Sequence, residues 1–199
     1  MTPPAPGRSA LLVMDAQQVI VERLPGRAGA QRGLGQLARA AKLARAAGLP
    51  VIYVVIAFRG RHPEVGRHNK LLSSAKSRDF LLESDPATAV HPRVAPHAGD
   101  IIVTKRRVDS FFGSDLDILL RAQQIDALLL TGFTTSGVVL STFLSAVDRD
   151  FHVTVLADCC ADSDPELHEL LVTRLFPQRA CVQTVAEWSA ALRPAATGR

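Results

Sequence analysis

An aspartate and a lysine each follow an apolar run that is typical of a buried strand. Asp15 comes directly after residues 10–14 (ALLVM), and Lys105 comes directly after residues 100–104 (DIIVT). A carboxylate in such a position is either a structural cap or a general acid or base. Lysines are seldom buried without a partner. We therefore expect the two side chains to pair, which offsets the cost of burying each charge and tunes both proton affinities.

A third segment is rich in glycine and hydroxyl side chains. It covers residues 131–142 (TGFTTSGVVLST) and links an apolar run at 127–131 to a helical pattern at about 136–148. The first N–H groups of a helix can hold an anion or a developing oxyanion. The segment also fits an ordinary strand-to-helix turn, so both interpretations stay open on this pattern alone.

These segments belong to a regular alternation of strand and helix patterns. Strands are predicted at residues 10–14, 51–57, 100–104, 127–131, 152–156 and about 180–183. Helices are predicted at residues 34–47, 115–123, 136–148, from Pro165 and just after Thr184. The alternation predicts a three-layer α-β-α fold, with a mostly parallel, six-stranded, Rossmann-like sheet and helices on both faces. Ligands of such sheets bind beyond the carboxyl ends of the strands, where Asp15, Lys105 and Asp158 are expected.

Several residues predict where helices begin and end. Gly48 is placed to end the first helix, while Ser114 and Asp164 are predicted N-caps. Thr184 and Glu187 form a capping-box pattern. The stretch 59–99 breaks the alternation, with one short helix expected near 78–83; so long a loop is usually functional or mobile.

The bulk composition predicts one domain of residues 9–193, with a flexible arm at 1–8 and a flexible tail at 194–199. With 23 Lys and Arg against 19 Asp and Glu, the net charge is only +4, and the basic residues are scattered. We therefore expect no nucleic-acid partner. No apolar run approaches the ~20 residues that span a bilayer, so no membrane partner is expected. Three cysteines, two of them adjacent, form no disulfide framework and favour a reducing, cytoplasmic compartment.

Four segments, in order, resemble the isochorismatase-like hydrolase superfamily, also called cysteine hydrolases, over roughly residues 9–188. They are residues 12–17 (LVMDAQ), 103–112 (VTKRRVDSFF), 132–135 (GFTT) and 158–162 (DCCAD). The resemblance implies that Asp15 and Lys105 are catalytic, that the Phe133–Thr134 peptide bond is cis, and that the chain forms a homo-oligomer, a dimer or tetramer. On the same motifs we expect the substrate to contact Gln17, Phe112, Thr134, Thr135 and Val138. No cofactor is expected.

One position departs from the family pattern. In the amidase members, the seventh residue counted from the glycine of the turn is a cysteine nucleophile, but counting from Gly132 reaches Val138. Valine cannot attack a carbonyl. Cys159, Cys160 and Cys181 lie elsewhere and are expected to pack as small hydrophobes. The isochorismatases proper also lack this cysteine and hydrolyse a vinyl ether by acid/base chemistry, although their Tyr-Ala-His-containing segment differs from the segment here.

The loop after the second strand is where the family's nicotinamidases carry a metal site rich in Asp and His. Here residues 58–69 (FRGRHPEVGRHN) contain two histidines and one glutamate among arginines. We expect a solvated loop without a metal. Arg59 or Arg61 is instead expected to contact a carboxylate of the ligand, because a guanidinium suits bidentate binding.

Three functions remain open. The first is a hydrolase that acts on a small anionic molecule through Asp15 and Lys105, without a covalent cysteine intermediate. The second is a catalytically inactive binding or scaffold protein that keeps the fold and the charged pair. The third is an amidase that uses a displaced hydroxyl nucleophile, Ser136 or Ser141.

Overall fold

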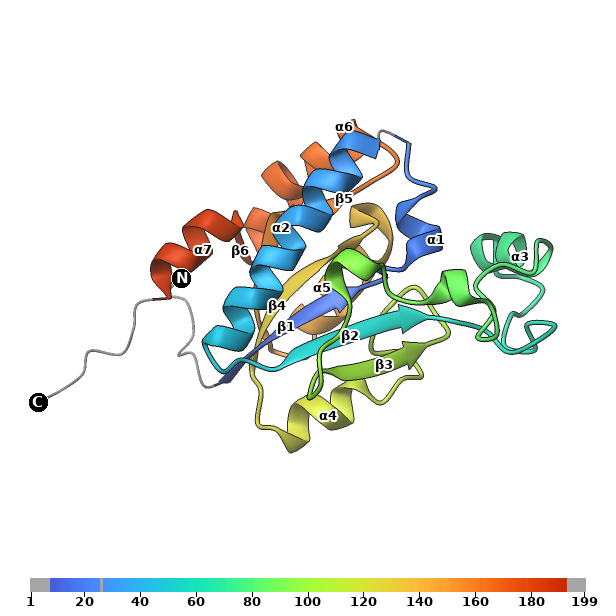
Figure 1. Cartoon of the computed structure of the whole chain (residues 1–199), viewed down its shortest axis with the longest axis horizontal. Coiled ribbons are helices and arrows are strands. Elements are labelled where there is room, and N and C mark those ends of the chain that lie inside the picture. The colour runs from blue at the N-terminus through green and yellow to red at the C-terminus, as the bar shows by residue number, and fades with distance from the viewer. Residues whose placement is uncertain (1–7, 26, 193–199) are drawn as a thin grey trace, which may run out of the picture.

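A computed structural model describes residues 8–25 and 27–192 of the chain. Six strands form one sheet in which all pairs are parallel, in the order β3-β2-β1-β4-β5-β6 (Figure 1). The strands are β1 (Ser9–Met14), β2 (Val51–Ile56), β3 (Ile101–Lys105), β4 (Ala127–Phe133), β5 (His152–Ala161) and β6 (Cys181–Gln183). The α/β prediction is therefore confirmed, including the number of strands. The predicted arm, except Arg8, and the predicted tail lie outside the described residues.

Helices cover both faces of the sheet, which explains why every residue of the central strands β1 and β4 is buried. The helices are α1 (Gln18–Val21), α2 (Arg27–Ala46), α3 (Lys70–Lys76), α4 (Leu116–Ala122), α5 (Leu140–Val147), α6 (Pro165–Leu170) and α7 (Val185–Ala191). Leu11 and Val13 point to the core under α2 and α7. Leu12 and Met14 point to the other core, under α4 and α5. Successive residues of β1 thus serve opposite cores, as the pleat of a strand requires.

Most of the predicted helix ends are confirmed. Gly48 has a φ of +72° just after α2, a conformation that glycine adopts without strain. The Asp164 carboxylate accepts hydrogen bonds from two N–H groups of α6, and Thr184 and Glu187 form a capping box on α7. The N-cap of α4 is Asp115 rather than Ser114, although the Ser114 hydroxyl still accepts a bond from the N–H of Leu116.

Three helical predictions need correction. The first long helix, α2, begins at Arg27 rather than at residue 34. The prediction began too late because the first turns of α2 carry no periodic large apolar residues. The short helix expected at 78–83 is wrong: Asp79 and Leu81 have φ values of +47° and +62°, which no α-helix allows. The helix in this region is α3, whose N-cap side chain is Asn69. The four-residue α1 was not predicted.

Strand β5 runs to Ala161, five residues beyond its predicted end at 156. A register shift between Leu130 and Gly132 lets the extension pair with β4, so that Gly132 lies opposite Cys160. Asp158 consequently lies inside the strand, not at its end. Its carboxylate accepts a hydrogen bond from the N–H of Val185 and positions α7, which corrects its expected place in the crevice.

A small third cluster of apolar residues lies beyond the carboxyl ends of β1 and β2. Figure 1 shows α3 and its loops standing apart from the three main layers on this side. The cluster contains Ile56, Phe58, Val65, Leu72, Ala75 and Leu81. His62 is fully buried beside it and bonds to the carbonyl oxygen of Phe80. This outlying unit forms the outer wall of the pocket described below. Across the described ranges, no helix combines the length and the apolarity needed to span a bilayer.

Candidate active site

Asp15 and Lys105 meet at the carboxyl end of the sheet, although β2 separates their strands. The Lys105 Nζ lies 3.0 Å from the Asp15 Oδ2. Lys105 is fully buried, and its Nζ also donates to the carbonyl oxygens of Arg107 (2.9 Å) and Val108 (2.8 Å). An ammonium group has three hydrogens, so these three acceptors use all of them. Lys105 therefore holds Asp15 in place and has no hydrogen left for an anionic group of a ligand.

Asp15 is placed to exchange a proton. Asp15 is only 6 % exposed, and its buried Oδ1 has no hydrogen-bond partner among the described residues. Burial raises the pKa of the Asp15 carboxyl above its ordinary value, against the lowering influence of Lys105. Its φ of +51° is unusual for a residue with a side chain, and such backbone strain clusters at functional sites.

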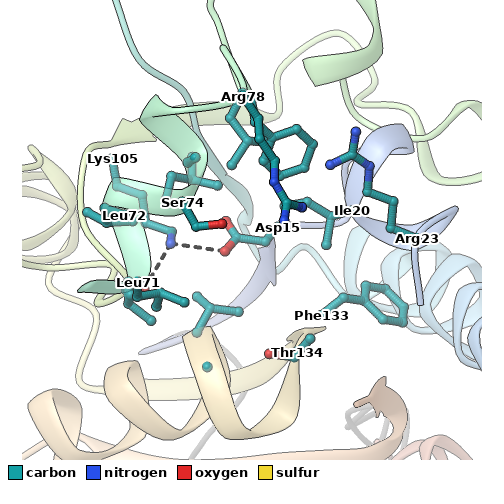
Figure 2. Close-up of a pocket in the computed structure, with 17 residues that line it drawn as sticks. Asp15, Ile20, Arg23, Leu71, Leu72, Ser74, Arg78, Lys105, Phe133 and Thr134 are labelled. Carbon is teal, nitrogen blue, oxygen red and sulfur yellow. Dashed lines mark hydrogen bonds and ion pairs between the residues drawn. The ribbon is translucent and has the colours of Figure 1, made fainter. Parts of the chain in front are cut away.

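A pocket of about 290 Å³ opens in front of this pair. Figure 2 shows Asp15 and Lys105 in its depth, with α3 on one side and the segment containing Phe133 and Thr134 on the other. Most of the lining is apolar: Ile20, Ile56, Leu71, Leu72, Ala75, Phe80, Leu81, Val108, Phe133 and Val138. The remaining lining residues are Asp15, Arg23, Ser74, Arg78, Lys105, Thr134 and Gly137. An apolar cavity with few convergent polar groups is the usual form of a small-molecule site.

Val138 occupies the wall of this pocket in the π-helical turn Thr135–Val139, at the entry to α5. The lining residues of the described chain include no cysteine. Cys159 and Cys160 belong to the two separate cores, and burial raises the pKa of the Cys160 thiol to about 12. Neither Cys159 nor Cys160 lines the pocket that contains Asp15. Ser136 and Ser141 do not line the pocket either, whereas the hydroxyl-bearing residues that do are Ser74 and Thr134.

The turn before α5 is held tightly from both sides. The Phe133–Thr134 peptide bond is cis, as the family resemblance implied. The hydroxyl of Thr135 lies 2.8 Å from the His168 Nδ1, and the N–H of Ser136 donates to the Asp162 Oδ2 at 2.6 Å. These bonds connect the pocket wall to α6 and to the end of β5. They also occupy the Ser136 amide, so this N–H is not free for a ligand.

The expected substrate-binding residues divide into two groups. Thr134 and Val138 line the pocket, whereas Gln17, Arg59, Phe112 and Thr135 are absent from its lining. The Gln17 side chain is buried and bonds to the backbone of Ile56 and Thr88, so it ties the end of β2 to the turn that contains Thr88.

The other residues outside the pocket have local partners or face outward. Arg59 pairs with Glu64 at 2.6 Å, and Phe112 is 65 % exposed on the surface. Glu64 also pairs with Arg106, so it is engaged by two guanidinium groups. The described residues contain no group of three or more His, Cys, Asp or Glu side chains arranged to hold a metal ion.

Two charged pocket residues were missed by the sequence analysis. Arg23 follows α1 and Arg78 follows α3, and the two arginines lie 55 residues apart along the chain. Neither carries a motif. Arg78 lies in the long 59–99 stretch that was expected to be functional, and this was the one available signal.

Comparison with known proteins places this architecture among characterised relatives. The isochorismatase domain model matches residues 9–187. Maleamate amidohydrolase from Pseudomonas putida is 29% identical over 141 residues, which are 71% of this chain and 65% of that protein. N-carbamoylsarcosine amidase from Arthrobacter is 31% identical over 123 residues, 61% of this chain and 47% of that protein. The chain thus spans about half to two thirds of the length of these two relatives.

The fold has close structural counterparts. The crystal structure of a cysteine hydrolase from Pseudomonas syringae pv. phaseolicola 1448A superposes with a TM-score of 0.87 at 27% sequence identity. The superposition covers 96% of this chain and 95% of the other. Nearly the whole chain therefore forms one copy of this fold.

Proposed function

The chain belongs to the isochorismatase family, and from that premise we propose that it hydrolyses a small anionic molecule with Asp15 as its acid/base group. The single observation that carries this proposal is the Asp15 carboxylate. One of its oxygens is held by Lys105, the other is unpartnered within the described chain, and Asp15 lines the pocket. The proposed reaction forms no covalent enzyme intermediate, since Val138 offers no nucleophile.

The step that we propose is direct attack by water. Asp15 accepts a proton from a water molecule while the oxygen of that water bonds to the electrophilic carbon of the substrate. The bond from that carbon to the leaving group then breaks, and Asp15 returns the proton to the leaving atom. A raised pKa of the Asp15 carboxyl favours this exchange near neutral pH, because the group both accepts and releases the proton readily.

The turn before α5 supports the same reaction. The N–H of Val139 donates to the carbonyl oxygen of Thr134, which closes the turn. The preceding residues, Gly137 and Val138, line the pocket at the start of the helix. N–H groups at such a position stabilise negative charge that develops on a substrate oxygen.

The names of the relatives suggest which bond to test first. Two of them are an amidohydrolase and an amidase, so maleamate and N-carbamoylsarcosine are the first compounds to assay. Product formation is followed by proton NMR, and intact-protein mass spectrometry is recorded during turnover. We expect turnover without a covalent adduct, and we expect Asp15→Asn to abolish it, by at least ~10²-fold.

Asp117→Asn is the matched control, because Asp117 lies on α4 and is absent from the pocket lining. Equal turnover in the Asp15→Asn variant would overturn the proposal. An acyl adduct on Ser74, Ser136 or Ser141 would favour the displaced-hydroxyl amidase instead. Failure of a broad panel of amides, ureido compounds and vinyl ethers to react would favour the inactive binding protein.

A further inference from the structure

The charges that line the pocket do not balance. Asp15 is the one acidic side chain in its described lining, and Lys105 already neutralises it. Arg23 and Arg78 are the two remaining charged groups of the lining. Neither has a carboxylate within 4.0 Å among the described residues, although arginines elsewhere, such as Arg45 and Arg106, do. The pocket therefore carries an excess of positive charge.

The two guanidinium groups are presented to the pocket from different elements. Figure 2 shows the Arg78 side chain descending toward Asp15, with Arg23 reaching the same side of the pocket from α1. The Arg23 guanidinium lies 4.0 Å from the ring centroid of Phe80, a cation–π contact that orients it. Asp79 is the nearest acidic neighbour of Arg78 in sequence, but its carboxylate faces His62 at 3.9 Å.

Both arginines are exposed to solvent, so water screens their mutual repulsion and their N–H groups are accessible to a ligand. An anionic ligand balances the two positive charges, and a guanidinium matches a carboxylate with two parallel hydrogen bonds. The apolar walls from α3 and Val108 suit the body of such a ligand. At about 290 Å³ the cavity lies at the small end of the ~300–1,000 Å³ that is typical of ligand sites.

We propose that Arg78 and Arg23 select the ligand of this pocket: a small carboxylate with an apolar body, whose charged end contacts the two guanidinium groups. Its other end then lies against Asp15, where the unpartnered Oδ1 meets it or an intervening water. The proposal rests on the proposed function only in treating this ligand as a substrate. These two arginines recognise the anion, because Lys105 has no free hydrogen.

A charge series of nearly identical shape tests the selection. Calorimetric titrations measure the affinities of benzoate, benzamide and benzamidinium, which carry negative, zero and positive charge. The wild-type protein is expected to prefer benzoate to benzamide by about tenfold or more, as hydrogen bonds to a charged group imply. Arg78→Met and Arg23→Met are expected to reduce that preference by about tenfold, and Arg78→Lys to give an intermediate value.

Arg179→Met is the matched control, because Arg179 is exposed and absent from the pocket lining. It is expected to leave the preference unchanged. Equal affinities of the three compounds for the wild-type protein, or no measurable binding of any, overturn the proposal. So does a benzoate preference that survives in both the Arg78→Met and the Arg23→Met variants.

The binding test does not depend on catalysis. Asp15→Asn is expected to keep the preference for benzoate while turnover of any substrate is lost. A preserved preference with no hydrolysis in any assay would reject the hydrolase and leave the selectivity standing. Hydrolysis of neutral amides with no preference for benzoate would reject the selectivity and leave the hydrolase standing.

Discussion

Lys105 donates to Asp15 with one hydrogen and to two carbonyl oxygens with its others, so the pair is closed on the lysine side and open on the aspartate side. The carbonyls are those of Arg107 and Val108, which lie two and three residues after Lys105 in the chain. The bend after β3 therefore wraps around its own ammonium group. This arrangement makes Lys105 the fixed member of the pair and Asp15 the member that can react.

Removing Lys105 is expected to be costly because it leaves a buried carboxylate without a partner. We expect Lys105→Met to lower the free energy of unfolding by about 3–5 kcal/mol in urea denaturation at neutral pH. Asp15→Asn together with Lys105→Met is expected to restore part of this loss, because no buried charge remains. An additive double variant would contradict the coupling.

The same variant has a predicted pH dependence. Burial already raises the pKa of Asp15, and loss of Lys105 removes an influence that lowers it. A carboxyl whose pKa is higher in the folded than in the unfolded protein binds more protons when folded, so stability falls as pH rises between the two values. Lys105→Met is therefore expected to be least destabilised in acid, and a loss independent of pH would argue against a buried Asp15 carboxylate as the cause.

Placing a thiol at position 138 is expected to create a reactive cysteine. Val138→Cys nearly conserves volume and is expected to cost less than about 1.5 kcal/mol. Because residue 138 and Asp15 line one pocket, the carboxylate can accept the thiol proton. Treatment with p-nitrophenyl acetate is expected to give one acetyl adduct per chain by intact-protein mass spectrometry.

Adding Asp15→Asn to Val138→Cys is expected to slow the acetylation by roughly 10²-fold, the usual contribution of a general base. Val139→Cys is the matched control, because Val139 is fully buried in the core under α4 and α5. Acetylation of the position-139 thiol at the same rate would show that the site adds nothing to reactivity.

The sheet and the Asp15–Lys105 contact were predictable for one physical reason. Residues at the carboxyl ends of the strands of a parallel sheet emerge at the same edge, and apolar runs reveal such strands locally. Helix ends follow from equally local signals, as Asp164 and Gly48 show.

The wall opposite the sheet was not predictable in this way. Arg78 and Arg23 reach the pocket through two loops and two short helices that carry no periodic pattern. Their placement depends on packing of α3 through Leu72 and Ala75, a long-range contact that leaves little trace in nearby residues. Arg59 illustrates the converse, since its position after a strand suggested a ligand contact but Glu64, five residues away, engages it.

Gly132 is expected to be the least replaceable glycine of the site. A Cβ built there would lie 2.4 Å from the carbonyl oxygen of Met14, and the φ of +152° is rare for residues with side chains. Gly132→Ala is expected to lower the free energy of unfolding by about 3 kcal/mol, measured by urea denaturation. Gly29→Ala on α2 is the control, since its Cβ would meet nothing within 4 Å and alanine gains up to about 1 kcal/mol in a helix. If Gly29→Ala lowered the free energy of unfolding as much as Gly132→Ala or more, this account of the β1–β4 contact would be refuted.

His168 is expected to make the support of the turn before α5 sensitive to acid. Its Nδ1 lies 2.8 Å from the Thr135 hydroxyl, and burial lowers the pKa of the imidazole, against the influence of Glu169 and Asp162. Between its folded and its unfolded pKa, the unfolded chain holds a proton that the folded protein does not, so acidification favours unfolding. We expect the free energy of unfolding to fall as pH decreases from 7.5 to 5.5, and to fall less in His168→Gln. If His168→Gln left the pH dependence of the unfolding free energy unchanged, His168 would have the same protonation in the folded and the unfolded protein. The Ser136–Asp162 bond would then be the support of the turn that remains.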